Sequence, residues 1–365
     1  MDIPLSKLTH ILYIAKVDSF YTTFEIPKKS GEPRTICAPT GDLKQIQYKL
    51  YDVLLNHEKK IKKKNNIQRN ISHGFEKNKN IITNSEIHRN KRIVINIDLQ
   101  DFFDSFHFGR VVGFFEKNKN YKCTNEVATL IAQLTCYNGK LPQGAPTSPL
   151  ITNMICQIMD MRILRIAKKY HLDYTRYADD LSFSTNDKKF LEKWEVFYKE
   201  ITNEIVCAGL KVNADKTRMQ YRDSRQSVTG LTVNKKINVD RRFYKQVRAM
   251  ANSLYTKNTF VNGTKEGTIK QLEGKFAFID QIDKYNNIKD KDNHSVYNLS
   301  GRERQYQKFL FFKYFIALDK PLIITEGKTD VKYLKSALKK LYKDYPELVE
   351  KNTDGTFNFK ISFLR

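Results

Sequence analysis

The amino-acid sequence predicts an α+β protein in which helices cover an antiparallel sheet. An apolar run at residues 93–97 has the composition of a buried strand. Two shorter runs, at 172–176 and 181–184, flank a turn at 177–180 and predict a hairpin. The stretches between these runs have helical apolar spacing. Strand, helix, helix and hairpin in this order are typical of helices packed against an antiparallel sheet.

The first 92 residues predict helices around a second hairpin. Residues 21–26 and 34–38 are predicted strands, joined by a basic turn at 27–33. A helix is predicted next, because apolar residues recur at helical spacing at Leu43, Ile46, Leu50, Val53 and Leu54. The basic run at 59–64 suits either a solvated segment or a contact with nucleic acid.

Beyond the hairpin at 172–184, the pattern becomes helical and then changes again. Residues 239–285 carry two apolar stripes, one from Tyr244 to Leu254 and one from Leu272 to Ile279. A polar stretch at 286–305 predicts a linker. From residue 307 the pattern reads helix, strand, helix, which predicts a separate α/β segment with elements at 309–318, 321–325 and 329–341.

Composition indicates a polyanionic partner. The 365 residues include 64 Lys and Arg against 40 Asp and Glu, which gives a net charge of +24 and a pI near 9.6. Each basic side chain that neutralises a phosphate releases a counterion, so this excess favours binding to nucleic acid. Acidic lipid is the competing partner, but the sequence has neither a basic amphipathic helix nor a lipidation signal to support it.

The cysteines indicate a reducing compartment. They are widely spaced and form no Cys-x-x-Cys pair, which argues against a disulfide framework and against a zinc site: Cys37, Cys123, Cys136, Cys156 and Cys207. The N-terminus does not resemble a signal peptide. The apolar segment 309–318 is too short and too charged to span a bilayer. We therefore expect a cytoplasmic protein.

Three carboxylates carry the chemical prediction. Asp98 follows directly on the predicted strand 93–97, and Asp179 and Asp180 lie at the predicted hairpin tip. Adjacent acids repel each other, so they favour a bound cation or a raised pKa. If the strand and the hairpin are neighbours in one sheet, the three acids can meet around two metal ions. Such a pair of ions suits phosphoryl transfer.

The loop 141–149 is a second functional candidate. Its sequence is Leu-Pro-Gln-Gly-Ala-Pro-Thr-Ser-Pro, and a helix is predicted to follow. Gly144 permits a close backbone approach, and the prolines fix the turn. Gln143 offers donors and an acceptor to a base or a sugar. A plain proline-rich turn is the alternative.

These elements together resemble the palm of reverse transcriptases. The resemblance rests on residues 97–103 (Ile-Asp-Leu-Gln-Asp-Phe-Phe), on 141–149 and on 177–180 (Tyr-Ala-Asp-Asp), which occur in the family's order. Residues 209–217 resemble the next motif, and the likeness covers roughly residues 10–285. Two short elements narrow it to retron reverse transcriptases. They are Asn-Ser-Glu-Ile-His at 84–88, with Ser85 where Ala is usual, and Val-Thr-Gly at 228–230.

The resemblance implies a right-hand polymerase and assigns roles to its residues. The implied domains are fingers at 1–92, a palm at 93–238, a helical thumb at 239–290 and a linker at 291–306. The implied metal ligands, for two Mg²⁺ ions, are Asp98, Asp179, Asp180 and the backbone carbonyl of Leu99. The implied nucleotide contacts are Lys28, Lys29, Arg34, Asp101, Phe102, Phe103, Gln143, Gly144 and Lys216. Among these, the Phe103 ring would face the sugar 2′ position and exclude ribonucleotides.

The two retron elements imply a role in RNA recognition, carried by Asn84, Ser85, His88, Val228, Thr229 and Gly230. His88 also suits a purely structural role. On the implied thumb, Lys245 and Arg248 suit a grip on a nucleic-acid duplex.

The resemblance implies an RNA-directed DNA polymerase that uses deoxynucleoside triphosphates. Retron enzymes copy part of a structured noncoding RNA into single-stranded DNA, starting from a guanosine 2′-hydroxyl, and the product stays bound. Anti-phage defence and association with an effector or with further copies are implied as well. Two alternatives remain open: a non-retron palm enzyme, such as a group II intron-like or other defence polymerase, and a nucleic-acid scaffold that controls a Toprim effector.

The segment 307–365 resembles the start of a Toprim domain. Residues 321–330 (Pro-Leu-Ile-Ile-Thr-Glu-Gly-Lys-Thr-Asp) place an acid and a glycine after an apolar strand, and Thr329 is the expected N-cap of the next helix. In a Toprim domain Glu326 would help bind Mg²⁺, and Asp330 lies in the same motif. The later Asp-x-Asp pair is missing before residue 365. We therefore expect either an incomplete domain or a docking segment without chemistry.

Overall fold

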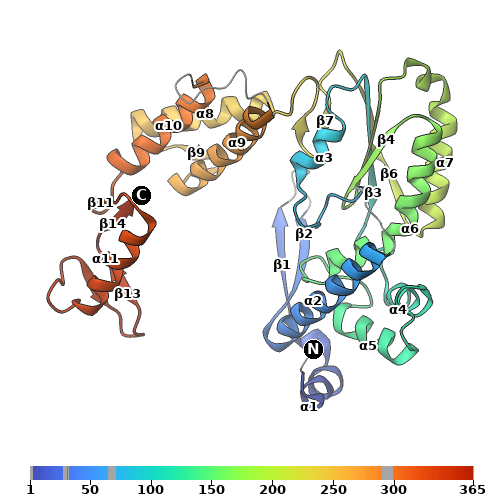
Figure 1. Ribbon diagram of the computed structural model, residues 1–365, viewed down its shortest axis with the longest axis horizontal. Coiled ribbons are helices and arrows are strands. Elements are labelled where there is room, and N and C mark those ends of the chain that lie inside the picture. Colours follow the sequence, from blue (N-terminus) through green and yellow to red (C-terminus); the bar gives the residue numbers. More distant parts are fainter. Residues whose placement is uncertain (1–2, 28–30, 32, 65–70, 290–298, 365) are drawn as a thin grey trace. The chain divides into compact units, whose positions relative to one another are not determined.

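The protein is described from a computed structural model that covers residues 3–27, 31, 33–64, 71–289 and 299–364. The chain divides into two compact units, Met1–Asn238 and Val239–Arg365 (Figure 1).

The first unit is built on a four-stranded antiparallel sheet with the strand order β4-β5-β3-β6. Its strands are β3 (Ile93–Gln100), β4 (Asp173–Tyr177), β5 (Asp180–Thr185) and β6 (Lys211–Tyr221). The predicted central strand and hairpin are therefore confirmed as neighbours in one sheet. The apolar, β-branched composition of β3 suits this central place, because all but its last residue are buried.

The side chains of β3 alternate between the two faces of the sheet, and the two faces have different surroundings. Ile93, Ile95 and Ile97 join the main hydrophobic cluster, while Val94 packs with Val228 and Val233 on the opposite face. Successive residues of a strand point to opposite faces, so Asp98 is on the Val94 face and away from the main core. The apolar run thus both anchors the strand and directs its terminal acid toward the functional face.

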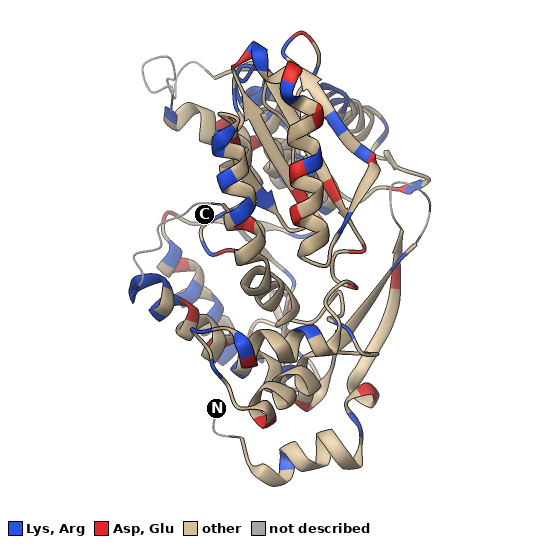
Figure 2. Ribbon diagram, turned by 90° about the vertical axis from the view of Figure 1, so that its right-hand side faces the viewer, with Lys and Arg blue, Asp and Glu red and all other residues tan. Residues whose placement is uncertain are grey.

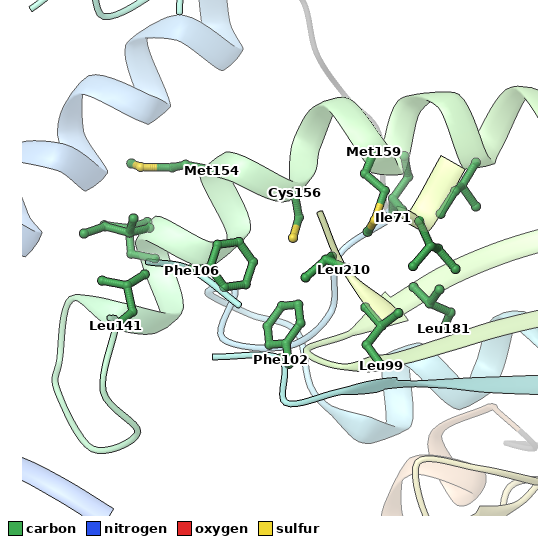
Figure 3. Packing of buried hydrophobic residues seen from close by; sticks show 14 of the residues in the cluster. Ile71, Leu99, Phe102, Phe106, Leu141, Met154, Cys156, Met159, Leu181 and Leu210 are labelled. Atoms are coloured by element: carbon green, nitrogen blue, oxygen red, sulfur yellow. The ribbon is translucent and has the colours of Figure 1, made fainter. Parts of the chain in front are cut away.

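Helices cover the core face of this sheet, as predicted. The long helix α6 contacts β4, and α7 contacts α6 and β6. Figure 3 shows α6 side chains, including Cys156 and Met159, packed with Phe102, Leu99 and Leu181 from the sheet side. The helices of the unit are α1 (Leu5–Thr9), α2 (Gly41–Lys64), α3 (Ile81–Ile87), α4 (Phe108–Lys117), α5 (Asn125–Thr135), α6 (Ser148–Lys169) and α7 (Trp194–Cys207), with short turns η1 (His10–Ile14), η2 (Val17–Phe20) and η3 (Lys188–Lys193).

Two small hairpins complete the first unit. The predicted N-terminal hairpin is confirmed as β1 (Tyr21–Pro27) and β2 (Pro33–Pro39), and it leads into α2 as expected. The other hairpin pairs β7 (Ser227–Val228) with β8 (Leu231–Thr232). The basic run 59–64 forms the last turns of α2, so it is helical. Lys and Arg side chains are spread over many of the helices in Figure 2.

The second unit begins with the predicted helical region. Helix α8 (Arg241–Lys257) is capped by the Asp240 side chain, which accepts from the Arg242 amide. Helix α9 (Ile269–Lys289) follows after a small hairpin, β9 (Val261–Asn262) and β10 (Lys265–Glu266). The apolar stripes of both helices are buried as expected, for example at Val247 and Phe276.

The rest of the second unit corrects two expectations. The predicted linker 291–306 is shorter than expected, because α10 (Gly301–Phe311) already starts inside it behind a Ser300 capping box. The N-cap of α11 (Lys328–Lys340) is Gly327 rather than Thr329. The remaining elements are η5 (Phe312–Ile316), a parallel pair of β11 (Leu322–Ile324) and β14 (Ser362–Leu364), and a hairpin of β12 (Val349–Lys351) and β13 (Phe357–Phe359).

Two expectations based on composition can be compared with the structure. All five cysteines are free thiols in the structure. Among the described residues, no helix combines the length and the apolar character that crossing a bilayer requires.

Candidate active site

The sheet register brings the predicted acids together. Asp98 of β3 lies directly opposite Asp180 of β5, so both side chains leave the same face of the sheet. Asp179 is in the two-residue turn between β4 and β5, and its carbonyl accepts from the Leu99 amide at 3.0 Å. Sequence reasoning therefore located the acids correctly. A strand end and a hairpin tip meet because β3 pairs with β5.

Burial and mutual repulsion perturb these carboxylates. Burial, Asp179 and Asp98 raise the pKa of Asp180 to about 6, against a smaller opposing effect of nearby basic groups. Burial also raises the pKa of Asp179, and Asp98 adds to this rise. The raised pKa values mean that the charged forms of both carboxylates are unfavourable when no cation is bound nearby. A cation at this place would relieve that cost.

Lys216 already supplies one positive charge to the site. Its ammonium donates to both carboxylate oxygens of Asp98, at 2.9 and 3.2 Å. The hydrogen bonds to Asp98 raise the Lys216 pKa. The pairing of β3 with β6 jumps from Asn96–Arg218 to Asp98–Asn213, so β6 bulges outward and carries Lys216 across Asp98.

The carboxylates do not form a ready-made metal cage. Across the described ranges, no group of three or more His, Cys, Asp or Glu side chains is arranged to hold a metal ion. Asp98 instead faces the ammonium of Lys216. Carboxylate oxygens are nevertheless the ligands that Mg²⁺ prefers, and Asp98 demonstrably binds a cationic group here. The ligand roles of the three acids, and that of the Leu99 carbonyl, remain predictions.

Only some of the residues predicted to contact the triphosphate are among those that the structure describes. Arg34 of β2 is exposed, and its charge lowers the pKa of Asp179, so the finger-like hairpin acts electrostatically on the site. Lys28 and Lys29 lie outside the described residues. The turn after β3 begins at Asp101, whose φ is +46°, and Phe102 is buried behind it.

Phe103 lies on the accessible side of that turn and is half-buried. Its ring packs edge-on against Phe75 with the centroids 6.3 Å apart. Sequence reasoning did not identify Phe75, which no motif marks.

The loop 141–149 docks against the N-terminal hairpin. The Cys37 amide donates to the Gln143 carbonyl at 2.7 Å. Gly144 has φ +121°, and a Cβ there would lie 2.9 Å from the Cys37 carbonyl oxygen. Only glycine satisfies both the backbone conformation and this spacing. The loop therefore holds the start of α6 close to β2. The side chain of Gln143 stays partly accessible.

A buried polar network, which sequence reasoning missed, supports the hairpin from behind. The guanidinium of Arg176 is fully buried and donates to both carboxylate oxygens of Asp160 at 2.8 Å. It also donates to the Ala178 carbonyl at 3.2 Å, inside the turn. The Tyr174 hydroxyl donates to Asp160 at 2.9 Å. The available signal was an arginine within an otherwise buried strand, which requires a buried acid as its partner.

The turn itself is held in an unusual backbone conformation. Ala178 has φ +56°, which is uncommon for a residue with a Cβ. Gly74 presses against this turn, because a Cβ on Gly74 would lie only 2.6 Å from the Ala178 amide nitrogen. The Asn153 amide donates to the Gly74 carbonyl at 2.9 Å. The segment before α3 and helix α6 thus jointly fix the turn that carries Asp179.

The two short retron-like elements contact each other. The Ser85 hydroxyl of α3 donates to the Val228 carbonyl at 3.0 Å and lies 3.3 Å from the Thr229 hydroxyl. Asn84 and Ser85 are fully buried, and so is Val228, whereas Thr229 is half-buried and Gly230 is exposed. The Ser85 hydroxyl and the Val228 carbonyl therefore join α3 to the β7–β8 hairpin, and the burial of Asn84, Ser85 and Val228 does not fit a direct contact of their side chains with RNA. RNA contact remains a prediction for Thr229 and Gly230.

His88 is a structural histidine in this protein. Its two ring nitrogens are hydrogen-bonded to the hydroxyls of Ser184 and Thr175, each at 2.7 Å. Burial lowers the pKa of His88 to about 3, helped by nearby positive groups, so the ring is neutral. It joins α3 to both strands of the hairpin, which agrees with the structural role that the sequence suggested, whereas a role in RNA recognition does not fit this burial.

Two predicted sites belong to the second unit. Lys245 and Arg248 are exposed on α8, as a surface that grips nucleic acid requires. In the Toprim-like motif, the Asp330 carboxylate accepts from the Gly327 amide at 2.9 Å and caps α11, while Glu326 is exposed. Asp330 therefore has a local structural role.

Comparisons with known proteins show which family the chain is similar to. The reverse transcriptase (RNA-dependent DNA polymerase) family matches residues 26–233. The retron Mx162 reverse transcriptase of Myxococcus xanthus is 31% identical over 313 residues, and the alignment covers 78% of this chain and 62% of that protein. The retron Ec86 reverse transcriptase of Escherichia coli is 33% identical over 288 residues, which are 76% of this chain and 83% of the relative. The chain thus spans less than two thirds of the first relative's length.

A telomerase structure from Candida tropicalis is similar with a TM-score of 0.46 and 14% identity, over 84% of this chain and 63% of that one.

Proposed function

Because the chain belongs to the reverse transcriptase family and is homologous to retron reverse transcriptases, we propose that it copies a structured noncoding RNA into single-stranded DNA. Asp98, Asp179 and Asp180 would carry out the transfer at the end of β3. The observation that carries this proposal is the register that sets Asp98 opposite Asp180, with Asp179 in the adjoining turn. Priming from a guanosine 2′-hydroxyl and a role in anti-phage defence are the finer parts of the proposal.

The residues of the site suit two divalent cations, which we propose to be Mg²⁺. Asp179 and Asp180 are destabilised as anions by burial and by each other, and a cation would remove that penalty. When bound, the ions would supply charge neutralisation at the attacking hydroxyl and at the leaving pyrophosphate. Lys216 would then leave Asp98 for a phosphate oxygen, since its side chain is 66% exposed and a phosphate can reach it.

The surrounding residues would orient the nucleotide. The Arg34 guanidinium carries several N–H donors in a planar arrangement that matches phosphate oxygens. Its positive charge already lowers the pKa of Asp179. The Phe103 ring, which packs edge-on against Phe75, would lie against the sugar 2′ carbon and select deoxynucleotides. The buried Arg176 network would keep the turn in place while charge builds up in front of it.

The C-terminal segment has no proposed chemistry. Asp330 is engaged as a helix cap, because its carboxylate accepts from the Gly327 amide. We propose that 307–365 acts as a Toprim-like binding segment in this chain.

The proposal is tested with the purified chain, its cognate RNA, deoxynucleoside triphosphates and Mg²⁺. RNA-linked DNA should form, and its RNA junction should contain a 2′–5′ branched guanosine. Asp179→Ala combined with Asp180→Ala should abolish synthesis while the circular dichroism spectrum is unchanged. Equal synthesis by this double variant would reject the assigned site. DNA with a free 5′ end would support a non-retron reverse transcriptase instead. RNA binding that survives chelation, with no DNA product under any condition, would favour a scaffold.

A further inference from the structure

The second unit contains a large cleft that the polymerase proposal does not use. It lies between the start of α9 and the C-terminal α/β segment and has a volume of about 840 Å³. Its lining combines lysines with aromatic rings, and those that carry the inference are Lys270, Lys320, Lys335, Phe359 and Phe363. We infer that this cleft binds a single-stranded nucleic acid.

The charge of the cleft favours an anion. Within the described part of the chain, neither Lys270 nor Lys335 pairs with a carboxylate, and Lys320 donates to a backbone carbonyl at 2.6 Å. Lys313 also lines the cleft, but Glu273 neutralises it at 2.5 Å. Asp319 is the one acid among the lining residues. Three ammonium groups against one carboxylate leave a net positive surface that suits phosphate groups.

The aromatic side chains favour nucleotides over other anions. Phe359 and Phe363 are half-buried neighbours whose ring centroids are 6.2 Å apart. The Lys335 ammonium lies over both rings, 5.6 and 5.3 Å from their centroids. A phosphate that binds Lys335 therefore brings its own base within reach of these rings. Aromatic platforms beside cationic groups are how proteins hold unpaired strands without reading their sequence.

A polymer suits the cleft better than a free nucleotide does. The three ammonium groups come from three different places in the chain: the first turn of α9, the approach to β11, and the middle of α11. A strand offers a phosphate at every nucleotide and can contact all three groups at once. This binding requires neither the palm acids nor any polymerase activity.

The test measures the binding of a fluorescent single-stranded DNA to the full chain carrying Asp179→Asn and Asp180→Asn, in EDTA. This background separates a failure of the cleft from a failure of the polymerase proposal. Lys270→Gln, Lys320→Gln and Lys335→Gln are combined and compared with Lys332→Gln, Lys340→Gln and Lys343→Gln. The control removes the same charge from exposed lysines of the same unit that do not line the cleft.

The cleft variant should reduce the slope of log K against log salt concentration by about 2, because each contact on a single strand contributes roughly 0.7. The control should leave that slope nearly unchanged. Equal losses in both variants would overturn the inference. A nucleoside triphosphate that displaces the fluorescent strand as well as an unlabelled oligonucleotide does would also overturn it, since the cleft would then be a site for a single nucleotide.

A photocrosslinking experiment on the protein with Phe359 and Phe363 in place provides an independent measurement. A 5-iodouracil oligonucleotide should crosslink to the peptide that contains Phe359 and Phe363. Phe359→Leu with Phe363→Leu should remove this crosslink and weaken binding at least about fivefold for each base that stacks. Crosslinks confined to the first unit would refute the assignment even if the leucine variant failed to fold.

Discussion

Replacing Asp160 by Asn tests whether the buried network supports the hairpin. Asp160 is 4% exposed and its partner Arg176 is fully buried, so the guanidinium has no access to water if the pair is broken. An asparagine keeps the shape but offers one acceptor oxygen. The NH2 group of the asparagine then faces an N–H of the guanidinium, and two donors cannot form a hydrogen bond with each other. Breaking a buried ion pair by removing one partner costs about 3–5 kcal/mol, and this is the expected loss in unfolding free energy.

The matched control is Asp173→Asn, which makes the same chemical change on the same hairpin. Asp173 pairs with Lys91 at 2.6 Å, but their side chains are 45% and 24% exposed. A surface pair of this kind contributes about 0–1 kcal/mol. A second comparison, Tyr174→Phe, removes one hydrogen bond to Asp160 and leaves the ion pair intact, so it should cost about 1 kcal/mol.

Urea denaturation followed by tryptophan fluorescence measures these differences in the right unit. The chain has one tryptophan, Trp194, and it lies on α7 of the first unit. Asp160→Asn should lower the transition midpoint far more than Asp173→Asn, with a similar urea dependence. The combination of Asp160→Leu with Arg176→Met should recover much of the loss, because no charge is left buried. A single Asp160→Asn as mild as the surface control would refute this account.

Three further predictions concern other parts of the site. The folded-state pKa of His88 is about 3, below its usual 6.5, so the unfolded chain binds a proton that the folded chain excludes between these values. Unfolding free energy should therefore fall as pH drops from 6.5, by up to about 1.4 kcal/mol per pH unit, and His88→Gln should remove this contribution in urea titrations at pH 7 and pH 5. Gly74→Ala would place a Cβ 2.6 Å from the Ala178 amide nitrogen, so DNA synthesis should fall at least tenfold while RNA affinity, measured by filter binding, stays within a factor of about three; unchanged synthesis would mean that the turn tolerates displacement. Phe103→Ala should raise the use of ribonucleotides relative to deoxynucleotides at least tenfold in competition assays, and an unchanged ratio would place the sugar elsewhere.

The sequence predicted the sheet and the place of the acids because their signals are local. A short run rich in β-branched residues, such as 93–97, favours a buried strand over a helix, and Asp98 follows directly at its end. The pair Asp179 and Asp180 lies between two short strands, which requires a turn. The positions of these three residues then follow from one long-range fact, the pairing of β3 with β5.

Features that depend on contacts between distant residues were not predictable in the same way. The partner of Arg176 is 16 positions away on α6, and no local pattern identifies it. Likewise, Ser85 and Val228 are separated by 143 positions, so the sequence marked both elements but did not reveal that they are hydrogen-bonded to each other. The bulge that carries Lys216 over Asp98 is a register shift in β6, and periodicity does not predict it.

The most direct test of the central claim is a single-turnover primer-extension assay on an RNA template with Mg²⁺. Asp180→Asn should reduce the rate of deoxynucleotide incorporation by at least about a thousandfold, while Asp173→Asn, at the far end of the same hairpin, should leave it within a factor of about two. Raising the Mg²⁺ concentration should not rescue the Asp180 variant. Incorporation at similar rates by both variants would contradict the claim that the acids at the end of β3 perform the chemistry.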